Sequence, residues 1–287
     1  MSLGRLEEAV VPRKTSLDLH HELKNSSEAA CDARNLADLF LALGKLCESE
    51  KATRLAIEYD LSSGDIKSKM ISYARLATVL HRLGQLEPAQ EIFAQAEELQ
   101  QQVNSEHPYL WSLRGAWYCA FLLEIAKDSD NFNQVLKRAE YIFLLDKTKQ
   151  PLLDKAYYNL TKARTYQSLQ QPIEAADAFN IAVQTIQKAG KIQYMPEFYL
   201  ARAKFCICQN DLLKAEADIK TANHTINRCG MKLYAVDAAL LQAHFCLAKN
   251  DPITAKAHAE QAEMLIAKTG YHLRDKALAE LKQNLKN

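Results

Sequence analysis

The sequence predicts an all-α protein: an α-solenoid of helix hairpins that repeat about every 40 residues and wind into a right-handed superhelix. The stretch YARLATVLHRLGQLEPAQEIFAQAEEL, Tyr73–Leu99, shows apolar residues every three to four positions on both sides of Gly84. The same turn position recurs at 40-residue steps, with one step of 46, and a small or β-branched residue stands five positions beyond it. The turn positions are Gly4, Gly44, Gly84, Asp130, Gln170, Asn210 and Asn250, followed by Ala9, Ser49, Ala89, Val135, Ala175, Ala215 and Ala255.

A second series supports the period. Twenty residues after the turn stand Gly64, Gly190, Gly230 and Gly270, with Asn104 in one copy. These residue types adopt the left-handed conformation that ends many helices. The chain has only 8 Gly and 7 Pro in 287 residues, which fits a protein that needs turn residues only between helices.

The first units are expected as follows. Residues 4–9 read as the middle of a repeat, so the chain is expected to open with an orphan second helix whose partner lies upstream in a longer protein. Pro12 falls inside this helix and should kink or restart it. Asn25-Ser26-Ser27 should cap a helix that runs to about Leu43, and its partner should run from Leu46 to about Leu61.

The later units are more regular. The expected helices are 152–169, 173–189, 196–209, 212–229, 233–249 and 252–268, with Asp211 and Asp251 as N-caps and Pro252 in a first helical turn. A last amphipathic helix, 274–286, should cover the end of the stack. Residues 1–287 therefore read as one superhelical domain of about six full repeats, an N-terminal half repeat and a C-terminal capping helix.

The rhythm breaks between Gln100 and Asp130, where six extra residues fall. The segment between Tyr109 and Glu124 is the most aromatic in the chain. One interpretation is a long core helix that buries Trp111, Tyr118 and Leu122. The other places Trp117 and Arg114 toward a groove as a ligand platform, because aromatic and guanidinium groups often carry binding energy. The two interpretations apply to different faces of the helix and both stay open.

Composition argues against several function classes. With 36 basic and 35 acidic residues the net charge is +1, which gives no basis for nucleic-acid or membrane-surface binding through bulk charge. The seven cysteines lack a disulfide-framework spacing, so a reducing cytoplasm is expected. No phosphate-binding loop, HExxH motif or metal-ligand spacing occurs, and the CxC pair Cys206/Cys208 is interpreted as structural. We expect no enzyme activity, no cofactor and no metal.

The hairpin pattern, with small residues at the crossings (Ala77, Ala89, Ala96) and the late aromatic Phe93, resembles the tetratricopeptide repeat (TPR). In that fold the first helix of each hairpin lines the concave side. In phase, this resemblance places Arg34, Asp38, Thr78, His81 and Glu124 inward, and it implies a groove for a protein or peptide partner or a small ligand. The candidate binding residues are Arg82, Arg114, Trp117, Tyr157, Arg164, Gln167, Lys204 and His244.

A narrower resemblance rests on the runs NLADLFLALG (35–44), LHRLGQLEPAQEIFAQAE (80–97), YLWSLRGAWYC (109–119), GMKLYAVDAALL (230–241) and GYHLRD (270–275). They are similar to the TPR region of bacterial STAND-type signalling ATPases, including NACHT-containing ones. This implies a non-catalytic sensor or scaffold that belongs to a larger signalling protein. The alternative is a self-contained TPR regulator that binds a peptide or small ligand and switches a partner.

Overall fold

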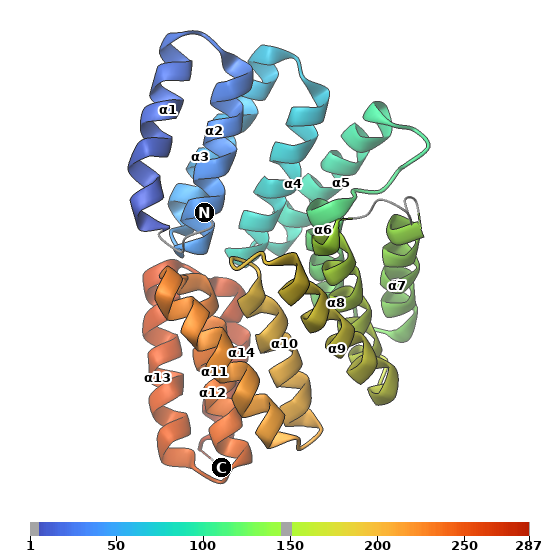
Figure 1. The fold of residues 1–287 in the computed structure, drawn as a ribbon, viewed down its shortest axis with the longest axis vertical. Helices are drawn as coiled ribbons and strands as arrows, with labels where there is room; N and C mark the ends of the chain where they lie inside the picture. The colour runs from blue at the N-terminus through green and yellow to red at the C-terminus, as the bar shows by residue number, and fades with distance from the viewer. Residues whose placement is uncertain (1–5, 145–150, 287) are drawn as a thin grey trace.

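The structure, a computed structural model, describes residues 6–144 and 151–286, and every regular element in these ranges is a helix (Figure 1). Gly4 lies outside the described residues. The predicted helices of the regular units agree with the observed ones to within two residues at each end. The elements are η1 (Glu7–Ala9), α1 (Val10–Glu22), α2 (Ser26–Ala42), α3 (Leu46–Ser63), α4 (Ile66–Arg82), α5 (Leu86–Val103), α6 (Ser112–Ile125), α7 (Ser129–Leu144), α8 (Leu152–Ser168), α9 (Pro172–Ala189), α10 (Met195–Cys208), α11 (Leu212–Cys229), α12 (Lys232–Ala248), α13 (Pro252–Thr269), η2 (His272–Arg274) and α14 (Asp275–Asn284).

Consecutive helices pack as hairpins: α2–α3, α4–α5, α6–α7, α8–α9, α10–α11 and α12–α13. Helix α1 packs on α2 at one end of the chain, and α14 packs on α12 and α13 at the other. The chain changes from the short 3-10 helix η1 to α1 at Val10. Pro12 therefore lies in the first turn of α1, where its missing N–H would have no partner within the helix. The predicted fold class, an all-α solenoid of TPR-like hairpins, is confirmed.

Small residues set the close approach within each hairpin. The position five residues after the turn is fully buried in Ala89, Ala175, Ala215 and Ala255, each 0% exposed. A larger side chain there would push the two helices apart. Ser49 occupies the same position in the first hairpin, and its hydroxyl donates to the Ala37 carbonyl at 2.8 Å. That hydrogen bond explains how a polar residue is accommodated at the crossing.

In five hairpins the residue predicted at the turn between the two helices has a positive φ. Gly44 and Gly84 have φ of +73° and +79°, and the helices α3, α9, α11 and α13 end on glycines with φ between +64° and +72°. Gln170, Asn210 and Asn250 adopt the left-handed region without being glycine. Two expectations are wrong. Asn104 is extended, with φ −155°, and Asp130 lies in the first turn of α7 rather than in a turn.

The hairpin α6–α7, which follows the break in the period, packs differently on the unit before it. Elsewhere the second helix of a unit packs on the first helix of the next: α3 on α4, α7 on α8, α9 on α10, and α11 on α12. Helices α5 and α6 lack this close packing along their lengths. They touch through large rings instead, with Phe93 stacked on Tyr118 at 4.5 Å between centroids. The six extra residues therefore open the stack between α5 and α6.

Residues 104–111 form the connection between these two helices. The aromatic segment is expected to be helical from about Tyr109, but Trp111 is extended, with φ −120° and ψ 170°, and α6 begins only at Ser112. The expected burial of Trp111 is also wrong, since its side chain is 50% exposed at the end of this loop. Tyr118 is buried as expected, and Leu122 is half-buried.

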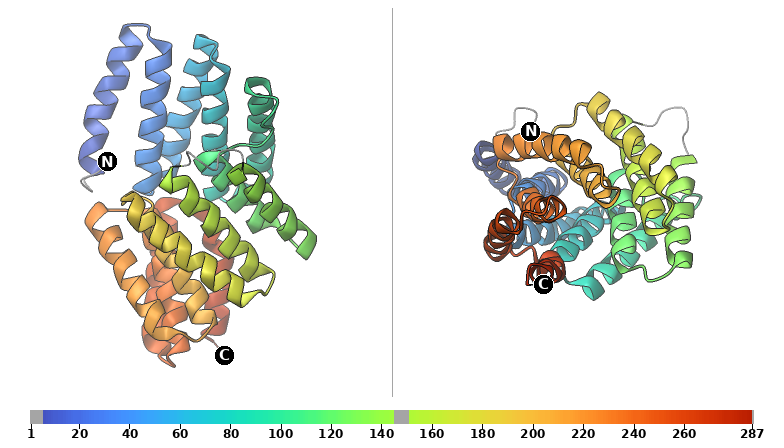
Figure 2. Two further views of the ribbon diagram at one scale, coloured as in Figure 1. Left: turned by 45° about the vertical axis from the view of Figure 1, so that its right-hand side comes forward. Right: turned by 90° about the horizontal axis from the view of Figure 1, so that it is seen from below.

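The superhelix brings the last hairpin back beneath the first (Figure 2). Leu46 at the start of α3 joins one apolar cluster with Leu233 and Val236 of α12. The turn at Gly44 sits so close to this layer that a Cβ there would lie 2.7 Å from Thr269 Cγ2. Glycine is required both by the positive φ and by this contact. The two ends of the stack are therefore in direct contact.

Candidate functional site

The first helices of successive hairpins contact each other around the inside of the superhelix, in the order α2, α4, α6, α8, α10 and α12, and α12 in turn contacts α2. Polar side chains from these helices meet there. Asp38 of α2 accepts two hydrogen bonds from the Arg75 guanidinium, both at 2.6 Å. The same guanidinium lies over the ring of Trp117, 5.9 Å from its centroid. The predicted site residue Trp117 is half-buried at this point.

Glu197 of α10 engages two of the predicted binding residues. Its carboxylate accepts hydrogen bonds from Arg164 Nη1 and from the Tyr157 hydroxyl, each at 3.0 Å. Tyr157 is only 5% exposed, and burial, reinforced by Glu197, holds the pKa of its phenol well above the usual value. Both side chains are thus hydrogen-bonded within the protein, and Tyr157 also lines a cavity.

Arg82 of α4 forms a hydrogen bond with a residue near the C-terminus. Its Nη1 donates to the Tyr271 hydroxyl at 2.7 Å, although the two residues are 189 positions apart. Tyr271 is 0% exposed, and Arg274 donates from Nε to Asp237 at 2.6 Å beside it. We call Arg82, Asp237, Tyr271 and Arg274 the C-terminal clasp. It joins α4 to α12 and to the segment before α14.

Arg114 differs from the other arginines. It is half-buried on α6, its Nε is buried without a hydrogen-bond partner, and none of the carboxylates in residues 6–144 and 151–286 forms an ion pair with it. Burial and the nearby Arg75 lower the pKa of its guanidinium, while Asp154 opposes this shift. In the described ranges every other arginine that is not exposed donates to a side-chain oxygen. An unpaired, partly desolvated guanidinium is costly, so Arg114 is a group that a ligand anion would satisfy.

The remaining predicted residues lie apart from this centre. Gln167 is half-buried on α8, whereas Lys204 and His244 are exposed on α10 and α12. Removal of water from part of its ring and the nearby Lys204 lower the pKa of His244. Of the other inward expectations, Thr78 and His81 are buried and Arg34 is bonded to Asp60 at 2.8 Å. Sequence reasoning missed the acids that complete the network, Glu197 and Asp237. Glu197 stands on a first helix, as its partners Tyr157 and Arg164 do, whereas Asp237 of α12 bonds to Tyr271 and Arg274, which lie after the last hairpin.

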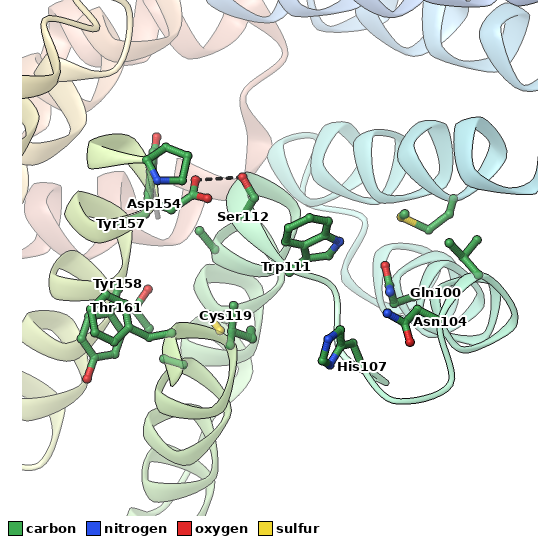
Figure 3. A pocket seen from close by; sticks show the side chains of 18 of the residues that line it. Gln100, Asn104, His107, Trp111, Ser112, Cys119, Asp154, Tyr157, Tyr158 and Thr161 are labelled. Atoms are coloured by element: carbon green, nitrogen blue, oxygen red, sulfur yellow. Dashed lines mark hydrogen bonds between the residues drawn. The ribbon is translucent and has the colours of Figure 1, made fainter. Parts of the chain in front are cut away.

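A second feature is the cavity where α5 and α6 diverge, with a volume of about 460 Å³ (Figure 3). It lies among the end of α5, the 104–111 loop, the start of α6 and helix α8. The Gln100 side chain, only 2% exposed, lines it, and its Oε1 has no hydrogen-bond partner. His107 Nδ1, also in the lining, is likewise buried without a partner. A buried carbonyl left unpaired costs about 1–3 kcal/mol.

The start of α6 is held in an unusual conformation beside this cavity. Ser112 has φ +57°, a region that non-glycine residues rarely adopt, and its hydroxyl donates to Asp154 at 2.8 Å. Burial raises the pKa of Asp154. A Cβ on Gly115 would lie 2.2 Å from the Leu110 carbonyl oxygen, so glycine lets the loop press onto α6. Strain, a buried unpaired acceptor and a cavity thus coincide at the break in the repeat.

Within residues 6–144 and 151–286, no group of three or more His, Cys, Asp or Glu side chains is arranged to hold a metal ion. Over the same residues, no helix combines the length and the apolar character needed to cross a bilayer.

Comparison with known proteins yields a fold and no family assignment. No protein-family model and no curated protein matches the sequence. Among solved structures, a tetratricopeptide repeat protein from Parabacteroides merdae is similar over 98% of this chain and 99% of its own, with 16% identity and a TM-score of 0.55. PilF of Pseudomonas aeruginosa aligns over 88% of this chain and 99% of its own, with 16% identity and a TM-score of 0.45. The first of these supports a TPR-type fold for this chain.

Proposed function

We propose that this chain is a non-catalytic recognition module that binds an acidic segment of a protein partner on the inner side of its superhelix. The observation that carries the proposal is Arg114, the half-buried guanidinium without an acceptor. Arg75 and Trp117 lie beside it, and Arg75 is already paired with Asp38, so an incoming carboxylate would meet the Arg114 guanidinium next to a second, neutralised cation. The two nearby carboxylates of the chain itself already accept hydrogen bonds from other residues: Asp38 from Arg75 and Asp154 from Ser112.

The role that fits this module is the sensor or scaffold part of a larger bacterial signalling protein. The similarity of five sequence runs to the TPR region of STAND-type ATPases supports it, as does a fold whose inner face is built from one helix of each hairpin. The alternative is a self-contained regulator that binds the same acidic segment and switches the protein that carries it. Both place recognition at Arg114 and differ only in whether an ATPase and an effector share the polypeptide.

The site can be tested without knowing the partner. A library of random peptides would be selected against the protein, and the best acidic binder would be measured by fluorescence polarisation. Arg114→Gln should weaken binding about tenfold or more, because a charge-assisted pair is lost. Arg228→Gln, which changes an exposed arginine on α11, should leave binding unchanged.

A peptide in which the critical Asp or Glu is replaced by Asn or Gln completes a double-mutant cycle. This replacement should weaken binding to the wild-type protein and have little effect on the Arg114→Gln variant. If the two changes add independently, or if selection returns no acidic peptide, Arg114 does not hold a partner carboxylate.

A further inference from the structure

The cavity between α5 and α6 arises from the geometry of the stack. It lies where the packing of one hairpin on the next is interrupted, because the 104–111 loop separates the two helices. Its volume of about 460 Å³ is in the range of sites that hold small organic molecules. Ser112, Gly115 and Cys119 of α6 line the cavity and Arg114 does not, although Asp154 both lines the cavity and lies near Arg114.

The walls of the cavity are mostly apolar and include several rings. Met70 and Val103 contribute from α4 and α5, and Phe143 and Tyr158 contribute a stacked pair with centroids 4.0 Å apart and planes within 8°. Trp111 lines the cavity on the side of the 104–111 loop (Figure 3), and it is 50% exposed. Flat aromatic molecules are the ligands that such walls fit best, through stacking and edge contacts.

The polar groups define the ligand further. Gln100 Oε1 is an acceptor without a donor, so the ligand should offer an N–H or O–H group. The charged groups of the lining are Lys67, which is exposed, and Asp154, which already accepts from Ser112. With no unpaired buried charge among the described lining residues, the ligand should be neutral.

We propose that this cavity binds a small, neutral, planar aromatic molecule that donates one hydrogen bond to Gln100 Oε1 and contacts Trp111 and the Phe143–Tyr158 pair. Indole and 1-methylindole are suitable probes, since they share shape and polarity except for the single N–H donor. Binding can be followed on the ¹⁵N-labelled protein through the Trp111 indole and Gln100 carboxamide signals in two-dimensional NMR spectra.

Indole should shift both signals saturably, and 1-methylindole should bind at least tenfold more weakly. Gln100→Met keeps the side-chain length but removes the acceptor, so it should abolish the preference between the two probes without lowering the melting temperature. Val103→Trp, at a half-exposed lining position, should fill the cavity and abolish binding of both probes while the protein stays folded.

Several results would overturn the proposal. Equal affinity for the two probes would show that Gln100 accepts no ligand hydrogen bond, and no signal shift at 5 mM indole would show that the cavity does not take aromatic molecules. Unchanged indole binding by Val103→Trp would place the probe elsewhere. Should Gln100→Met fail to fold, the Val103→Trp variant and the comparison of probes on the wild-type protein still decide the question.

Discussion

Arg82 and Tyr271 stand 189 residues apart in the sequence, yet the guanidinium of one donates a 2.7 Å hydrogen bond to the hydroxyl of the other. The bond ties the second hairpin to the segment that precedes the last helix. Because Tyr271 is 0% exposed, its hydroxyl has no water to replace the arginine. This contact is therefore a buried polar link between the second hairpin and the C-terminal segment.

Replacing Tyr271 with Phe should destabilise the protein by about 1–2 kcal/mol, because Arg82 and Asp237 each lose a hydrogen-bond partner. The free energy of unfolding in urea measures the effect. Tyr73→Phe is the matched control, since no hydrogen bond of the Tyr73 hydroxyl occurs in the described structure, and it should change stability by less than about 0.5 kcal/mol. Equal losses in both variants would show that the clasp contributes nothing.

Ala89 lies at the crossing of α4 and α5 with no exposed surface. Ala89→Trp should overpack this crossing and cost about 1–3 kcal/mol or more. Glu91, two residues on, is exposed and should tolerate Ala within about 0.5 kcal/mol. Thermal unfolding of the two variants tests whether Ala89 faces α4 and Glu91 faces solvent. Similar losses of melting temperature in both would contradict this assignment.

Arg164→Glu should lower stability by about 1–3 kcal/mol. The change removes a donor from Glu197 and places a second carboxylate beside it, and Glu197 is only 12% exposed. Lys256→Glu, at an exposed position of α13, should have almost no effect. A comparison of their melting temperatures is sufficient. A wild-type melting temperature for Arg164→Glu would mean that the ion pair is absent in solution.

His81 should make stability depend on pH. Burial, together with Arg82 and Arg274, lowers the pKa of this imidazole from 6.5 to about 3. The folded state therefore stays neutral while the unfolded state takes up a proton, so stability is complete above pH 6.5 and falls as the pH drops toward 3. Between pH 7.5 and pH 5 the loss from this residue should be about 2 kcal/mol.

The His81→Leu variant isolates this contribution, because the other titrating groups are the same in both proteins. Urea unfolding at pH 7.5, 6 and 5 should show a steeper loss of stability for the wild type than for the variant. Parallel curves for the two proteins would mean that His81 is accessible to protons in the folded state.

The helices and most turns could be predicted because they depend on local signals. Asp211 and Asp251, for example, cap helices through their own side chains, which accept from Lys214 N and Thr254 N at 3.2 and 3.0 Å. The third hairpin was harder. A step of 46 residues placed its turn at Asp130, and one interpretation of the aromatic segment buried Trp111. In the structure Asp130 lies in the first turn of α7, and Trp111 is 50% exposed at the end of the 104–111 loop.

The candidate site was predicted less well than the fold. The resemblance to the TPR fold placed the first helices on the inner side, but neither it nor the periodicity can show which charges neutralise each other across the superhelix. Tyr157, Arg164 and Arg82 are engaged by Glu197 and Tyr271, contacts that join residues between 33 and 189 positions apart. Arg114 stands out only once these pairs are known. The cavity at Gln100 depends on the divergence of α5 and α6, for which the sequence shows only an irregular spacing.

The contact between the first and last hairpins changes how the chain should unfold. In an open repeat array each unit depends only on its neighbours, so the ends fray first and terminal units can be trimmed with a proportionate loss. Here Leu46 and the Gly44 turn rest on α12 and α13, so the terminal units support each other. Loss of the C-terminal hairpin would expose apolar surface on the N-terminal one, and the array should melt as a single cooperative unit instead of unzipping from its ends.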